Sequence, residues 1–142
     1  MSITEDLTAR IRAAGEYMAE HGHVRGTMRS VSGAVCMTGA VMYCQPQNGD
    51  EYLIREVLRH RGRAETWNDA PGRLASECVT YLSSSPDVTD AELAVTFGPQ
   101  WEAIVALVRR AASLTAGEAK ELVAARDAAG AAARVAAGDA AR

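Results

Sequence analysis

The sequence predicts an all-α protein, and three observations support this prediction. Much of the 48% hydrophobic share is alanine, which favours helices, and the chain has only 4 Pro and 1 Phe. Apolar residues recur at helical spacing in most segments. The capping-box pattern Ser/Thr-x-x-Glu, typical of helix starts, occurs three times. We therefore expect a compact all-α protein of about six or seven helices in all, with a helical core domain over residues 1–113 and an Ala-rich C-terminal helix or tail over 114–142.

The first helix is predicted to begin after Ser2, which forms a capping-box pattern with Glu5. Its inner stripe consists of Ile3, Leu7, Ile11, Ala14 and Met18. Gly22 is expected to end it as a left-handed cap. Residues 23–32 show little periodicity, so we expect a loop or short hairpin there.

One apolar run, GAVCMTGAVMYC at 33–44, is expected to be the centre of the fold. It carries no charge on any face, so we interpret it as a buried helix that is covered on all sides. Gly39 in its middle costs about 1 kcal/mol relative to Ala, which a closely packed neighbouring backbone would explain. A strand is the alternative, because Val35, Val41 and Tyr43 favour β structure.

Two further helices are expected between residues 50 and 83. Asp50 can cap the first of them, and Gly62 ends it. The inner face of this helix is formed by Leu53, Ile54, Val57 and Leu58. Asp69 can cap the second, and Pro71 suits its first turn. The apolar face of the second helix is predicted to contain Leu74, Cys78, Val79 and Leu82.

Capping boxes predict two of the remaining three helices. Thr89 and Glu92 form one box, flanked by the staple pair Val88 and Leu93, and that helix ends at Gly98. The next helix has the inner residues Trp101, Ile104, Val105, Val108 and Ala112. Thr115 and Glu118 then open the last helix.

The Ala-rich last helix has two different sides. Lys120, Asp127 and Arg134 lie on one side of a helical wheel. The opposite, small-residue side is formed by Leu122, Ala129, Ala133 and Ala136. This segment is either a frayed terminal helix or a docking surface for a partner protein or a second copy.

Composition and the N-terminal sequence indicate the cellular compartment and argue against some classes of partner. The formal net charge of −3 argues against a surface that is wholly a nucleic-acid footprint. The chain has 3 Cys, an odd number without a Cys-x-x-Cys pair, and its N-terminus has no apolar signal core. We expect a cytoplasmic protein of a bacterial host cell with reduced thiols, no membrane association and no cofactor.

Two motifs lie in the first two-thirds of the chain. The sequence HGHVRG at 21–26 runs on to Gly33-x-x-Cys36-x-x-Gly39-Ala40, and Trp67-Asn68-Asp69-x-Pro71-Gly72-Arg73 follows, with Glu77 beyond it. Together they resemble an uncharacterised family of small domains found in actinobacteria and their phages, over about residues 4–84. That family tends to have an aromatic residue in place of His23 and Thr in place of Leu74. The resemblance implies a cytosolic actinobacterial or phage setting and implies no mechanism.

Trp67, Asn68, Asp69 and Arg73 are the candidate ligand-binding residues. At a helix N-terminus, these polar groups and the free N–H groups could hold a polar or anionic ligand. The structural alternative makes Trp67 a core anchor, Asp69 a cap and Arg73 a partner for a neighbouring carboxylate. An enzyme or a small-ligand-binding protein would use this cluster.

Histidine and cysteine suggest two further kinds of site. His21, His23 and His60 with the cysteines could bind a metal, but the spacing lacks the paired ligands typical of zinc, so we assign no metal residues. A Cys-His nucleophile could use Cys36 or Cys78, although Cys36 lies in the least polar stretch. No catalytic residue is assigned.

A basic stretch contains Arg55, Arg59, Arg61 and Arg63. It could contact phosphate, but it is equally typical of a solvated helix end with favourable dipole charges. Because the chain is acidic overall, we do not expect nucleic acid to be the partner.

The function expected from these patterns is a non-catalytic interaction protein that self-associates or engages a host protein, and the family resemblance is compatible with a phage-encoded origin. It follows from the lack of catalytic motifs and from the small-residue face of the last helix. The alternatives are the small-ligand protein or enzyme described above and a structural component of a phage virion.

Overall fold

The computed structural model describes residues 2–140 and contains eight α-helices within that range. Their bounds are α1 (Ile3–His21), α2 (Met37–Tyr43), α3 (Asp50–His60), α4 (Glu65–Asn68), α5 (Ala75–Ser83), α6 (Asp90–Phe97), α7 (Trp101–Ala112) and α8 (Ala116–Ala140). The described residues form isolated β-bridges but no strand, which confirms the all-α prediction. The predicted number of helices was too low because the four-residue helix α4 was not foreseen.

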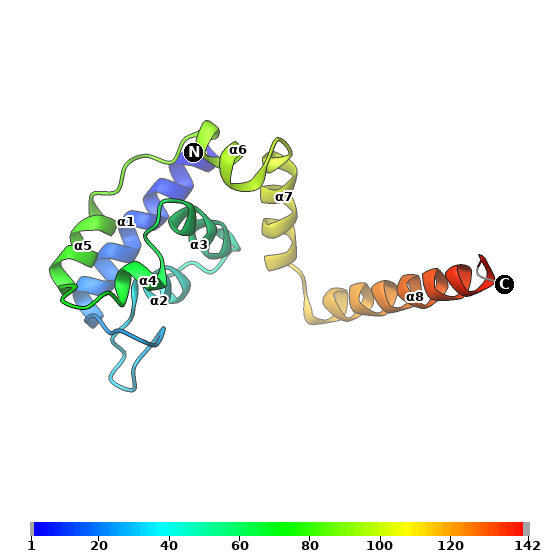
Figure 1. Ribbon diagram of the computed structural model, residues 1–142, viewed down its shortest axis with the longest axis horizontal. Coiled ribbons are helices and arrows are strands. Elements are labelled where there is room, and N and C mark those ends of the chain that lie inside the picture. Colours follow the sequence, from blue (N-terminus) through cyan, green and yellow to red (C-terminus); the bar gives the residue numbers. More distant parts are fainter. Residues whose placement is uncertain (1, 141–142) are drawn as a thin grey trace.

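The core is assembled around α1, which packs against α5 on one side and against α2 and α3 on the other (Figure 1). Gly15 allows α5 to come close, because a Cβ at this position would lie 2.6 Å from the Ser83 backbone nitrogen. α6 and α7 pack on α3. The predicted inner residues of α1 and α3 are buried, with Ile3 partly so, namely Leu7, Ile11, Ala14, Met18, Leu53, Ile54, Val57 and Leu58.

The apolar run at 33–44 is central, as expected, but only its second half is helical. Residues 35–41 and Cys44 are buried. Val35 is extended and forms β-bridges with His23 and Arg29, so α2 begins only at Met37. The helix prediction was therefore wrong for 33–36, where bonding to the 22–29 loop replaces intrahelical bonding. The Cys36 sulfur accepts the Gly39 N–H at 3.2 Å at the start of α2.

Gly39 has the close backbone neighbour that its position suggested. The Met28 carbonyl oxygen occupies the space that a Cβ at Gly39 would fill. The same loop residue accepts the Cys36 N–H at 3.2 Å. Glycine is thus needed where the loop crosses the central helix.

Arg10 of α1 holds the other end of α2. Its guanidinium donates to the carbonyls of Val41 at 3.0 Å, Cys44 at 2.6 Å and Pro46, and it lies 3.6 Å from the Glu51 carboxylate. The side chain is buried. A charged group in the core therefore satisfies the orphan carbonyls at the C-terminus of α2.

The sequence correctly located three N-terminal caps. Ser2 with Glu5 and Thr115 with Glu118 form reciprocal capping boxes. Thr89 accepts the Glu92 N–H at 3.1 Å, but the Glu92 carboxylate pairs with an arginine of the α3 end instead of returning to Thr89. Its staple partners Val88 and Leu93 are both buried. Gly22 has the expected positive φ of 95°, but its ψ of 165° is not that of a left-handed helical cap.

Asp50 does not cap α3. Gly49 is the N-cap residue, with φ 96°, and the Glu51 carboxylate accepts the Gly49 N–H at 3.1 Å. The Asp50 carboxylate is instead bound by Arg109 of α7 at 2.9 Å. Ion pairing between two helices has taken the place of local capping here.

Asp69 and Pro71 do not open a helix. Asp69 follows the last residue of α4, and α5 begins only at Ala75, after Gly72 with φ 79°. The left-handed Gly72 separates the two helices, because a helix cannot continue through that conformation. Leu74 consequently precedes α5 and is largely exposed, contrary to its predicted place on the apolar face, whereas Cys78 and Leu82 are buried as expected.

α8 extends away from the other helices (Figure 1). It has 25 residues, and most of its described side chains are exposed. Of the predicted inner face of α7, Val105 is buried, Trp101, Ile104 and Val108 are partly buried, and Ala112 is exposed. Among the described helices, none is both long and apolar enough to cross a membrane.

Candidate functional site

Asn68 is the centre of a buried hydrogen-bond network that joins the two sequence motifs. Its side chain is 0% exposed. Its Oδ1 accepts the Met37 N–H at 3.0 Å and lies 3.0 Å from Nε2 of His23. Its Nδ2 donates to the Val24 carbonyl at 3.1 Å and to Asp69 Oδ1 at 2.9 Å. All of the hydrogen-bonding capacity of the amide is therefore used within the protein.

Asp69 closes the same network on the surface side. Its Oδ1 accepts the Gly26 N–H at 3.0 Å, and this bond, with the Asn68 amide, holds the pKa of the carboxyl below its usual range. A carboxylate that accepts a loop N–H stabilises the loop conformation. The predicted role of Asp69 as a helix cap is thus replaced by a role in holding the 22–36 loop.

Trp67 and Arg73 form a stacked pair beside this network. The Arg73 guanidinium lies 3.8 Å from the centre of the Trp67 ring and donates to the Trp67 carbonyl at 3.1 Å. It also pairs with Glu77 at 2.5 Å, which lowers the pKa of that carboxyl. The Tyr81 ring also packs against the Trp67 indole, with the centres of the two rings 5.7 Å apart. Arg73 thus has the carboxylate partner that the structural interpretation expected.

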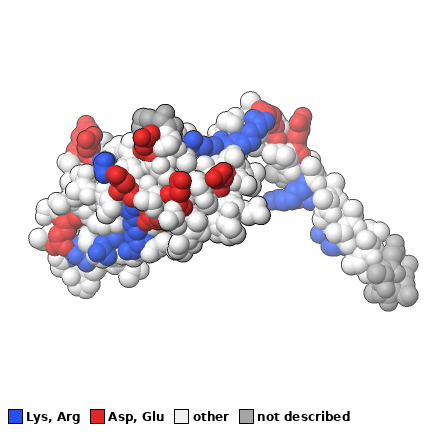
Figure 2. All heavy atoms as spheres, turned by 90° about the horizontal axis from the view of Figure 1, so that it is seen from above, with Lys and Arg blue, Asp and Glu red and all other residues white. Residues whose placement is uncertain are grey.

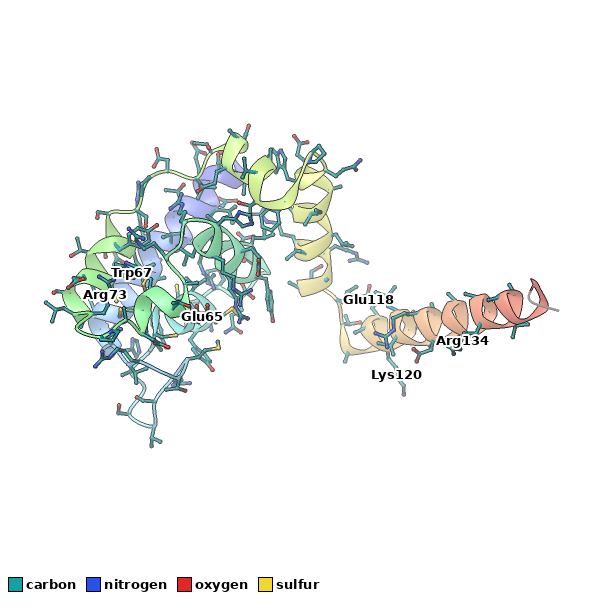
Figure 3. The ribbon with its side chains drawn as sticks, in the orientation of Figure 1. Glu65, Trp67, Arg73, Glu118, Lys120 and Arg134 are labelled. Atoms are coloured by element: carbon teal, nitrogen blue, oxygen red, sulfur yellow. The ribbon has the colours of Figure 1, made fainter. Side chains whose placement is uncertain are left out.

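The four candidate ligand-binding residues are brought together, but their polar groups point to one another and to the backbone. Figure 3 shows Trp67 and Arg73 side by side, on the opposite end of the molecule from the labelled residues of α8. A ligand at this cluster would have to compete with the internal bonds of Asn68 and Arg73. Ligand binding there remains a prediction without support from the geometry.

The candidate basic stretch is largely neutralised by neighbours. Arg55 and Arg59 lie 3.4 and 3.6 Å from the Glu65 carboxylate, and Arg61 forms a two-pronged pair with Glu92 at 2.6 and 2.7 Å. Arg63 lies over an aromatic ring, 4.9 Å from the centre of Trp67. These arginines offer few unpaired charges to a phosphate backbone. Figure 2 likewise shows acidic and basic residues intermixed on one face of the core.

The structure places one cysteine next to a histidine. Cys78 Sγ lies 3.6 Å from His23 Nε2. The same Nε2 directs its proton to the Asn68 oxygen, which cannot donate, so it is not free to accept the thiol proton. Burial raises the pKa of Cys78 to about 11, and burial also raises the pKa of Cys36 and Cys44. The thiols are accordingly held in the unreactive protonated form at neutral pH.

The described residues contain no group of three or more His, Cys, Asp or Glu side chains arranged to bind a metal ion. His21 stacks on Tyr17, with ring centres 3.9 Å apart, and His23 is bonded to Asn68. Both histidine rings are therefore engaged in contacts within the protein.

An apolar groove of about 520 Å³ lies in the corner between α7 and α8. Its apolar wall is formed by Leu107, Ala111, Leu114, Leu122 and Ala125. Leu107 and Leu122 are 69% and 57% exposed. At its rim, Arg110 pairs with Glu118 at 3.1 Å. Two large leucines that leave most of their surface in water are typical of a contact surface rather than of a folded core.

The candidate interaction face of α8 starts at this groove. Leu122 belongs to both, and Ala129, Ala133 and Ala136 continue the face along the helix. Lys120 and Arg134 are exposed as well (Figure 3). The visible surface of α8 is largely uncharged (Figure 2).

Two arginines and one leucine with structural roles were not predicted from the sequence. Arg10 and Arg109 hold helices together, and their only sequence signal is an arginine within an otherwise apolar helix face. Arg109 also donates to Asp6 at 3.1 Å, so it joins α7 to both α1 and α3. Leu107 was not predicted because it lies outside the predicted inner face of α7, where it is 69% exposed.

Residues 3–85 match the model of a family of unknown function, DUF6197. The chain belongs to this family. No curated protein and no solved structure matches the chain. The DUF6197 match contains α1 to α5 and therefore the whole Asn68 network, whereas the α7–α8 groove lies outside it. An uncharacterised family was expected and is confirmed at that level, while its actinobacterial or phage setting stays a prediction.

Proposed function

We propose that this member of DUF6197 is a non-catalytic interaction protein, and that α8, with the groove it forms against α7, is its contact surface. The protein self-associates or engages another protein through this surface. The main observation in support of this proposal is that Leu107 and Leu122 are exposed on the two walls of one apolar groove.

The length and position of α8 support the same proposal. Most of the stability of a protein helix comes from packing of one face, and isolated helices are marginal in water. α8 has 25 residues but packs few of its side chains on the rest of the chain. A partner that covers the Leu122 face would supply the missing packing.

The Asn68 network supports the proposal indirectly. Its polar groups are satisfied internally and its thiols are protonated, which favours a structural role for the family motifs. We further infer a reducing bacterial cytoplasm as the setting, because Cys36, Cys44 and Cys78 are free. A phage-encoded origin rests on the motif resemblance alone.

The test compares the full-length chain with a 1–113 truncation. Each would be measured by light scattering and used as bait in actinobacterial lysate, after circular dichroism has confirmed that the truncated core is folded. We expect the full-length chain alone to exceed the monomer mass or to retain a protein. Full-length protein that is monomeric and retains nothing would refute the proposal.

A matched pair of point variants sharpens this test. Leu122→Asp places a charge in the groove, whereas Val95→Asp places one on α6, where the valine is 75% exposed, against 57% for Leu122, and does not line the groove. We expect loss of association for Leu122→Asp and none for Val95→Asp. Equal effects of the two variants would mean that the groove has no special role.

A further inference from the structure

The 22–36 loop projects beyond the helices of the core (Figure 1) and carries a fully exposed apolar side chain, that of Val31. Among the described residues, Val31 is the most exposed of the large hydrophobic ones. A single exposed valine is ordinary on a protein surface, so its exposure alone assigns no role. The way in which the loop holds this residue is the second observation.

The tip of the loop, residues 30–34, is a tight turn with a fixed backbone. The Ser30 carbonyl accepts the Gly33 N–H at 3.0 Å, and the Ser30 N–H donates to the Ala34 carbonyl at 2.8 Å. The Ser30 hydroxyl oxygen also accepts the Ala34 N–H at 3.1 Å. Gly33 has φ 92°, the left-handed conformation that closes a hairpin turn of this kind. Val31 is therefore held at a defined position while its side chain stays in water.

The base of the loop is bonded to the Asn68 network. Asn68 donates to the Val24 carbonyl at 3.1 Å, and Asp69 accepts the Gly26 N–H at 3.0 Å. Across the base, the Val24 N–H donates to the Val35 carbonyl at 3.1 Å. Polar side chains of the core thus fix the conformation of a segment that projects into solvent. A loop that is ordered before binding loses less conformational entropy when a partner binds it.

The loop is positively charged in a chain that is acidic overall. Between Glu20 and Asp50 the sequence contains no acidic residue, whereas Arg25 and Arg29 lie within the loop. Both arginines are exposed, and neither forms an ion pair with any described residue. The Arg29 guanidinium lies over the ring of Tyr43, 5.1 Å from its centre, which restricts its position as well. The surface complementary to this loop is therefore acidic around an apolar centre.

We propose that the tip of the 22–36 loop is a contact surface that inserts Val31 into a small apolar pocket of an acidic partner protein. Arg25 and Arg29 then lie beside carboxylates at the rim of that pocket. A lipid surface matches the loop less well, because one valine buries too little apolar area to anchor a protein in a membrane. This contact is separate from that of α8, since the loop lies within the DUF6197 match and α8 lies outside it.

Photo-crosslinking from the tip tests the contact while Val31 is kept. Ser32→Cys in the full-length chain would be labelled with benzophenone maleimide, because the three native cysteines are buried. The labelled protein would be irradiated in bacterial lysate, with and without the further change Val31→Asp. We expect a cross-linked protein that is lost with Val31→Asp and persists with Val95→Asp, which places the same charge on α6.

Affinity measurements separate the apolar contact from the charged one. The cross-linked protein would be purified and its Kd for the unlabelled full-length chain measured by calorimetry. Val31→Ser removes the apolar group without adding charge, and we expect it to weaken binding about tenfold or more. Arg29→Gln should weaken binding and reduce its dependence on salt. Arg12→Gln is the control, because Arg12 is an exposed arginine of α1 that already pairs with Asp87.

Three results would overturn the proposal. The absence of any cross-linked protein, or cross-links that persist with Val31→Asp, would exclude the tip as the contact. An unchanged Kd for Val31→Ser would exclude an apolar pocket. Binding of the full-length chain to vesicles of phosphatidylglycerol and phosphatidylcholine in equal parts, if lost with Val31→Ser, would assign the tip to a membrane surface instead. None of these results bears on α8, whose role is tested by the 1–113 truncation.

Discussion

Asn68 accepts the backbone N–H of Met37, the first residue of α2, at 3.0 Å. This bond joins the Trp67-Asn68-Asp69 motif to the apolar run at the centre of the fold. It satisfies one of the orphan donors at the start of α2 from a distant part of the sequence. The two sequence motifs are therefore joined by one buried hydrogen-bond network.

Replacing Asn68 tests the contribution of this network to stability. Asn68→Ala leaves the buried Met37 N–H and the partly buried Val24 carbonyl without their partner, and an unsatisfied buried group costs about 1–3 kcal/mol. We expect a loss of at least about 2 kcal/mol in the free energy of unfolding, measured by urea denaturation. Thr66→Ala, at an exposed position two residues away, is the control and should change little. Equal stability of both variants would contradict the role of Asn68.

Gly39 offers a test of backbone packing. Gly39→Ala forces the Met28 carbonyl away from α2, so the variant should unfold at lower temperature. Gly138→Ala is the matched control, because a Cβ there meets nothing within 4 Å and alanine favours helix. Calorimetry of the two variants should therefore show opposite or clearly unequal changes. A stabilising Gly39→Ala change would show that the loop can withdraw freely.

Arg10 and Arg12 lie on the same helix, but Arg10 is buried and Arg12 is exposed. Their replacement therefore compares the loss of a buried charge with the loss of an exposed one. Arg10→Ala leaves three carbonyls without their donor and the Glu51 carboxylate without its buried counter-charge, and breaking a buried pair costs about 3–5 kcal/mol. Arg12 pairs with Asp87 at 2.8 Å on the surface, where such pairs contribute about 0–1 kcal/mol. Denaturant titrations should reproduce this order. A smaller effect at Arg10 than at Arg12 would be incompatible with the described packing.

The thiol of Cys78 predicts how stability depends on alkaline pH. Its pKa is raised by burial from the ordinary 9.0 to about 11, so the unfolded chain loses this proton at a lower pH than the folded one. The stabilising effect is complete below pH 9 and is lost as the pH rises toward 11. Unfolding free energies at several pH values should fall less steeply for Cys78→Ala than for wild type. Identical slopes would show that Cys78 titrates normally in the folded protein.

Much of the fold could be predicted from local patterns. Ser2, Thr89 and Thr115 cap helices where their spacing to a glutamate indicated, because capping depends on residues only three positions apart. The buried face of α3 followed from its periodicity. The closely packed neighbour of Gly39 was also predictable, since a glycine within a helix needs a packing reason.

The errors arose where partners distant in sequence decide the structure. Asp69 and Asp50 look like caps locally, but they bind Gly26 and Arg109, which lie far along the chain. Residues 33–36 look helical, yet their hydrogen bonds go to the loop before them. At the candidate surface, the small-residue face of α8 was visible in the sequence, while Leu107 became a candidate only when α7 and α8 formed a groove.

Hydrogen exchange of α8 tests most directly whether this helix is the contact surface. Amide exchange would be followed by mass spectrometry at low and at high protein concentration, and again with any protein retained from lysate. We expect the α8 amides to exchange rapidly in dilute protein and to become protected at high concentration or with the partner, while protection of α1 and α3 stays constant. Unchanged rapid exchange of α8 under all of these conditions would contradict the proposed function.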